Sequence, residues 1–230
     1  MCNFFSFVTD PVNHPAEYYY FDWEYRKAHM EEDGADSHSH ICARFKLDED
    51  VCNKYEFNPL TKAFTVDQIN SNRDDSEAAE KWANRQDFKT VVEPLVIKPI
   101  VNPLELPEVT EVTAEHIQWL KEWIAVSASI WNSVGDSVWN SVGNSVRASI
   151  WDSVWDSMWD SIWNSVWAPV CDSVWAYIGS FFDIDYKFDF SSAVKLWEAG
   201  LVPSFDGTTW RLHSGKDARV VYEWTPEVQE

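Results

Sequence analysis

Residues 151–166 read WDSVWDSMWDSIWNSV, which is four consecutive copies of a four-residue unit. Each unit has a variable first residue, then Asp, Asn or Ala, then Ser, and usually ends in Val or Ile. Looser copies extend the pattern from Ser127 to about Ile178, with an irregularity at Pro169. A period of four is far shorter than the roughly 20–50 residues of the common solenoid repeats, so the pattern matches none of them.

The period of four favours a helix over a simple strand. On a strand, Trp would share a face with Ser and Asp would share the other with Val, so neither face would be apolar. On a helix, each residue turns by about 100°, which places the Val of one unit beside the Trp of the next. This apolar stripe advances by about 40° per unit, so it needs a wrapping partner or several different neighbours. A narrow β-solenoid with four-residue sides is the alternative.

Eight of the fifteen tryptophans lie in these units. Each buried indole removes about 150–250 Å² of surface from water, so the row could serve simply to stabilise the fold by packing. A row of Trp can also stack nucleic-acid bases, but such sites need basic residues beside the rings. We therefore interpret the row as a surface for self-association or for a protein partner. Its members are Trp131, Trp139, Trp151, Trp155, Trp159, Trp163, Trp167 and Trp175.

Residues 1–90, before the repeat, are expected to form an α+β domain. Asn3–Val8 and Tyr18–Trp23 are aromatic-rich runs typical of strands. Lys54–Asp67 alternates polar and apolar residues around an Asn-Pro turn and predicts a hairpin. Asp75-Ser76 is expected to cap a following helix.

The rest of the chain divides into three segments, and together with residues 1–90 they are expected to form an α+β fold. Residues 91–112 carry regularly spaced prolines among aliphatic residues, which predicts an extended arm laid across an apolar surface, or else a semi-rigid linker. Residues 113–180 hold a helix and the repeat, and residues 181–230 a small helix-plus-antiparallel-sheet module with an Asp-Gly hairpin turn. In that module, Arg211 and His213 are expected on a solvated strand face.

Composition restricts the function classes. The formal charge is −20, with 38 acidic and 18 basic residues, which argues against direct nucleic-acid binding and against anionic membrane surfaces. No stretch is apolar enough to span a membrane, and the N-terminus does not resemble a signal peptide. The four cysteines do not form a disulfide framework. We expect a cytoplasmic protein without cofactors.

One residue and one group of residues are candidates for a catalytic or metal site. If the initiator Met is removed, Cys2 becomes an N-terminal thiol with its own α-amine as base, although its simpler interpretation is a small residue opening a strand. His38, His40 and Cys42 would share one face of a strand and, with Cys52, form a zinc site. Alternatively, Asp36-Ser37 caps a helix and scatters these side chains.

Several segments resemble an uncharacterised group of bacteriophage and prophage proteins. They are the opening MCNFFSFV, SHSHI at 37–41, NKYEFNPLT at 53–61 and GLVPSFDGTTWRLH at 200–213. Some members of the group carry Trp-Asp-Ser-Val or Trp-Asp-Ala-Ala units, and the Ala-rich units favour the helical interpretation. The resemblance implies a source in phages but no activity.

Three hypotheses for function follow. The first is a non-enzymatic phage accessory protein that forms a homo-oligomer, or captures a host or phage protein, through its Trp-lined repeat. The second is an acidic DNA mimic that inhibits a host defence or nucleoid protein. The third is an enzyme that uses Cys2 or a His/Cys metal site.

Overall fold

The computed structural model describes residues 5–29, 37–141, 150–154 and 167–226. The fold is α+β, with helices and two antiparallel sheets. The chain divides into two compact units, the first comprising Met1–Pro99 with Trp139–Trp151 and the second Ile100–Val138 with Asp152–Glu230. None of the described helices combines the length and apolar character needed to cross a membrane.

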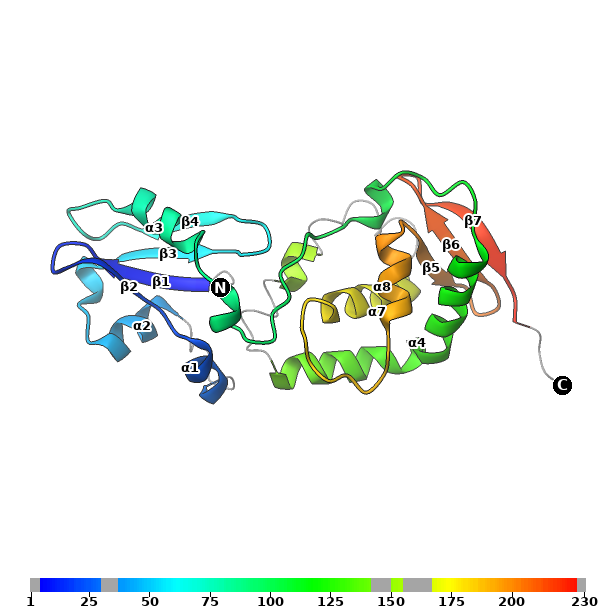
Figure 1. The fold of residues 1–230 in the computed structure, drawn as a ribbon, viewed down its shortest axis with the longest axis horizontal. Helices are drawn as coiled ribbons and strands as arrows, with labels where there is room; N and C mark the ends of the chain where they lie inside the picture. Colours follow the sequence, from blue (N-terminus) through cyan, green and yellow to red (C-terminus); the bar gives the residue numbers. More distant parts are fainter. Residues whose placement is uncertain (1–4, 30–36, 142–149, 155–166, 227–230) are drawn as a thin grey trace. The chain divides into compact units, whose positions relative to one another are not determined.

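The first unit is built on a four-stranded antiparallel sheet. Its strands are β1 (Phe5–Asp10), β2 (His14–Tyr19), β3 (Asn53–Phe57) and β4 (Phe64–Gln68), in the order β2-β1-β3-β4 (Figure 1). The predicted hairpin is confirmed as β3–β4. Its turn forms because the Asn58 carboxamide accepts from the backbone N–H of the second residue after it (2.9 Å), which is an Asx turn.

Helices lie on both faces of this sheet. They are α1 (Trp23–Ala28), α2 (His38–Phe45) and α3 (Ser76–Ala83), with the 3₁₀ turns η1 (Glu49–Val51) and η2 (Phe88–Thr90). Strand β1 is buried at all six positions because its residues alternate between the two helical layers. Val8 packs with Ile41 of α2, whereas the ring of Phe7 lies 4.9 Å from that of Trp82 in α3.

The expected strand over Tyr18–Trp23 is wrong beyond Tyr19. The backbone N–H of Tyr25 donates to the Asp22 carboxylate at 3.0 Å, so Asp22 caps α1 and Trp23 is the first helical residue. The chain therefore leaves the sheet earlier than its aromatic composition predicts, because a capping side chain competes with strand pairing.

Asp75 precedes α3, as expected, but its side chain does not cap the helix. Its Oδ1 instead accepts from Thr9 Oγ1 at 3.1 Å, from Asn53 Nδ2 at 2.8 Å and from Tyr55 Oη at 2.6 Å. The capping contact comes from Asp74, whose Oδ1 accepts from the backbone N–H at the first position of α3 at 2.9 Å. Asp75 thus fastens the start of α3 to β1 and β3.

The second unit contains a three-stranded antiparallel sheet with helices packed on it. Its elements are η3 (Pro103–Glu105), α4 (Ala114–Ser141, which runs across the boundary between the units), α7 (Trp167–Gly179), α8 (Ser191–Glu198), β5 (Val202–Phe205), β6 (Trp210–Ser214) and β7 (Arg219–Trp224). The strand order is β5-β6-β7, and α7 and α8 pack against β5 (Figure 1).

Side chains of this unit hold the part of the Pro-rich segment that follows Ile100. The Tyr177 hydroxyl accepts from the Val101 backbone N–H at 2.8 Å, and Trp197 Nε1 donates to the Val101 carbonyl at 2.9 Å. Further along, Ser214 Oγ accepts from the Val109 backbone N–H at 2.9 Å. Side chains thereby satisfy backbone groups that have no partner strand, which keeps an irregular segment tightly bound to the unit.

Candidate functional site

The repeat is helical wherever the structure describes its backbone. The units up to residue 141 lie in α4, residues 150–154 are helical, and the last units lie in α7. At the fourth position of the described units, Val134, Val138, Ile150, Val154 and Val174 are all buried, with at most 1% of each residue exposed. The aliphatic position therefore faces the protein interior.

The tryptophan position behaves differently. The structure describes the side chains of Trp151 and Trp175, and both are half-buried. Asp152, in the unit of Trp151, is exposed. Asp172, in the unit before Trp175, is half-buried, and burial raises the pKa of its carboxyl. The side chains of Trp131, Trp139 and Trp167, and all of Trp155, Trp159 and Trp163, lie outside the described residues.

The predicted His/Cys cluster does not lie on a strand. Residues 38–45 form α2, because Ser37 Oγ accepts from the His40 backbone N–H and caps the helix. His38 is buried, with Nε2 3.0 Å from the Tyr55 carbonyl and Nδ1 3.3 Å from Asp67 Oδ2. The ring of His40 is exposed and contacts Ser37 Oγ. The two imidazoles therefore point to different partners.

Cys42 and Cys52 do come together, in an apolar cluster with Val8, Phe21 and Ile41. Both are free thiols. Burial raises the pKa of the Cys42 thiol and raises that of Cys52 to about 12, so both stay protonated near neutral pH. They act here as small buried side chains, because metal ligation and nucleophilic attack both require the thiolate.

In the part of the chain that the structure describes, no three His, Cys, Asp or Glu side chains converge in a way that could hold a metal ion. The four residues of the predicted zinc site therefore lie in different surroundings. His38 is buried and bonded to other residues, the ring of His40 is exposed, and Cys42 and Cys52 are packed among apolar side chains. The N-terminal candidate, Cys2, lies outside the described residues.

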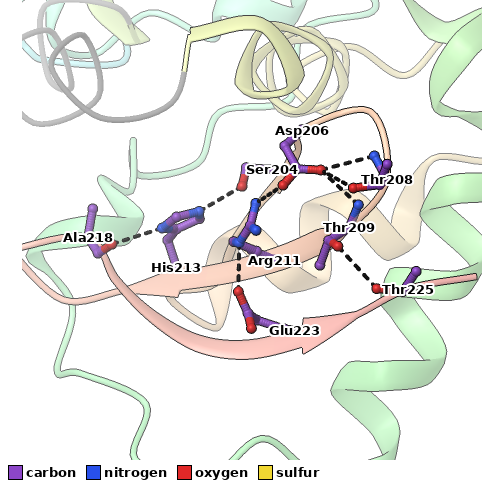
Figure 2. Close-up of polar contacts among 9 residues, drawn as sticks. All are labelled: Ser204, Asp206, Thr208, Thr209, Arg211, His213, Ala218, Glu223 and Thr225. Carbon is purple, nitrogen blue, oxygen red and sulfur yellow. Dashed lines mark hydrogen bonds and ion pairs between the residues drawn. The ribbon is translucent and has the colours of Figure 1, made fainter.

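The second unit contains a polar cluster joined by hydrogen bonds and ion pairs (Figure 2). The turn between β5 and β6 forms around Asp206, whose Oδ1 accepts from the backbone N–H of Thr209 at 2.8 Å and of Thr208 at 3.0 Å. These two N–H groups and the Arg211 guanidinium hold the pKa of the Asp206 carboxyl well below its usual range. Arg211 bridges Asp206 Oδ2 (2.6 Å) and Glu223 Oε1 (2.7 Å) and so joins the turn to β7.

Beside this ion cluster, Ser204 of β5 and His213 of β6 form a buried pair. The distance from Ser204 Oγ to His213 Nε2 is 2.7 Å, and His213 Nδ1 lies 2.8 Å from the Ala218 carbonyl (Figure 2). Ser204 is 5% exposed and His213 is 8% exposed. The expectation of a solvated face for His213 is therefore wrong, because the module buries this end of β6.

The sequence held little signal for this pair. Ser204 is directly opposite Arg211, and His213 is opposite Val202, so Ser204 and His213 are diagonal neighbours. A diagonal contact depends on strand register, which is fixed only once the hairpin turn is known. The Asp206-Gly207 pair predicts a hairpin, but the loop spans residues 206–209, so the observed pairing of Phe205 with Trp210 does not follow from a two-residue turn.

Comparisons with known proteins do not identify the chain. No family model matches it, and neither a curated protein nor a solved structure is detectably similar.

Proposed function

We propose that this protein associates with itself or with a protein partner through the tryptophan face of its repeat. The observation that carries the proposal is the contrast within the unit. Every fourth-position Val or Ile that the structure describes is buried, whereas Trp151 and Trp175 keep part of their surface exposed. The buried aliphatic residues anchor the repeat in the fold, and the exposed part of each of these two indoles can contribute to a contact with another protein.

The physical chemistry of Trp supports an interface. An indole offers a large rigid apolar area, and Trp is enriched in protein interfaces and among the residues that dominate their binding energy. The exposed Asp152 beside Trp151 provides a charged neighbour of the kind found at interface rims. The proposal includes a helix and a Trp row that continue through the whole repeat. It also includes a source in bacteriophages.

The test is the oligomeric state of the full chain, measured by light scattering during size exclusion. We expect an oligomer, or a partner that co-purifies from infected cells, and we expect Trp151→Ser with Trp175→Ser to abolish either assembly. Trp119→Ser is the matched control, because Trp119 is also a half-buried helical indole but lies before the repeat.

Two outcomes would count against the proposal. A native chain that is monomeric and brings no partner from infected cells has no association to explain. An oligomer that survives the double substitution but is lost with Trp119→Ser uses a surface outside the repeat. The DNA-mimic hypothesis stays a prediction, and the half-burial of Asp172 does not favour the regular exposed carboxylates that it requires.

A further inference from the structure

In the Ser204–His213 pair, the hydrogen bonds run in the direction that an activated nucleophile requires, from the hydroxyl to the imidazole. The Ala218 carbonyl can only accept, so the 2.8 Å contact places the proton of the neutral ring on Nδ1. Nε2 then carries a lone pair, and the Ser204 hydroxyl donates to it at 2.7 Å. A hydroxyl, a base within hydrogen-bond reach and a third group that orients the base are the three parts of such a site.

The surroundings keep the ring in its basic form. Burial lowers the pKa of His213, and the nearby positive charge of Arg211 acts in the same direction. The imidazole is therefore neutral at pH 7 and able to take a proton from Ser204. The orienting carbonyl is itself held by the β6–β7 turn, in which the Ala218 N–H donates to the Gly215 carbonyl at 2.9 Å.

We propose that Ser204 is a reactive serine that accepts an acyl group from a small activated ester, with His213 as its general base. As the bond from Ser204 Oγ to the acyl carbon forms, the hydroxyl proton moves to His213 Nε2. The ester C–O bond then breaks. An alcohol leaves with the proton from His213 Nε2, whereas a phenolate leaves as the anion and His213 gives its proton to water. The neutral imidazole then takes a proton from a water molecule that attacks the acyl-serine, and returns it to Ser204 Oγ as the acid is released.

The position of Ser204 limits the substrate to small groups. Only 5% of the residue is exposed. Ser204 lies opposite Arg211 on the same face of the hairpin, and the Arg211 side chain is 28% exposed (Figure 2). We expect a small acetyl ester to reach Ser204 along the Arg211 side chain.

The experiment treats the full-length protein with p-nitrophenyl acetate and follows both p-nitrophenolate release and the mass of the Ser204 peptide. We expect a burst of product and one acetyl group on Ser204. Ser204→Ala should remove both signals. His213→Gln should slow acylation by about 10²- to 10⁴-fold, the usual contribution of a general base. The acylation rate should also rise with pH and level off below the ordinary His pKa of about 6.5.

Ser192→Ala is the matched control, because Ser192 lies in the same unit and is equally buried, at 4% exposed. It should react like the native protein. Peptide mapping of the native chain needs no variant, so a misfolded His213→Gln does not weaken the test. If Ser204 carries no acetyl group in the folded native protein, or if Ser204→Ala releases p-nitrophenolate at the native rate, the pair only ties β5 to β6 and the proposal is wrong.

Discussion

Replacing Asp75 with Ala should be among the most damaging single substitutions in the first unit. One carboxylate oxygen accepts hydrogen bonds from Thr9, Asn53 and Tyr55, and these three residues are at most 2% exposed. Without Asp75, the Tyr55 hydroxyl and the Thr9 hydroxyl lose this acceptor inside the protein. Asn53 keeps a second bond from Nδ2 to the Arg73 carbonyl at 2.9 Å.

The magnitude follows from these donors. A buried donor left without an acceptor costs about 1–3 kcal/mol, and bonds to a charged acceptor lie at the upper end of the usual range. With two donors stranded and one weakened, Asp75→Ala should lower the free energy of unfolding by about 3–5 kcal/mol. Asp75→Asn keeps one acceptor oxygen, so its loss should be about 1–2 kcal/mol.

The assay is urea unfolding followed by circular dichroism, with Asp74→Ala as the control. Asp74 is the adjacent carboxylate, but it is exposed and accepts from the first backbone N–H of α3, so its loss should be clearly smaller. If Asp74→Ala destabilises the protein as much as Asp75→Ala does, helix capping dominates and the argument from buried donors is refuted.

Three further substitutions or conditions test other parts of the fold. Trp197→Phe removes the donor to the Val101 carbonyl, so it should cost about 1 kcal/mol and speed proteolysis of the Pro-rich segment. Gly179→Ala places a Cβ 3.0 Å from Val134 Cγ1, and this overpacking should cost about 1–3 kcal/mol in thermal unfolding. Because the pKa of His213 is lowered by folding, the unfolded chain binds more protons just below pH 6.5. Urea stability should therefore fall as the pH drops through that region, and His213→Gln should flatten the slope.

Local signals explain what could be predicted in the fold. The β3–β4 hairpin follows from alternating residues around Asn58, and the β5–β6 hairpin from the Asp206-Gly207 turn, where Gly207 adopts a φ of +99°. Helix α2 shows the limit of such signals. Its His and Cys alternation fits a strand, and only the cap at Ser37 indicates the helix that forms.

The candidate sites were predictable to different degrees. The repeat was visible from its period, and its Val and Ile positions lie inside, as a stripe pattern would place them. Of the two alternatives for residues 38–42, the strand face with a zinc site does not form, and the helix capped at Ser37 turns His38 and His40 toward different partners. Ser204 and His213 were missed as a pair because nine residues separate them in the chain.

The sequence alone determined the elements whose formation depends on close neighbours in the chain: the helix that follows Asp75, the two hairpins and the four-residue period. Tertiary structure decided that Asp74 caps α3 while Asp75 bonds to the sheet. It also decided that His213 is buried beside Ser204. Those outcomes depend on contacts such as that between Thr9 and Asp75, 66 residues apart in the chain. No local pattern encodes them, because they exist only after the strands have paired in register.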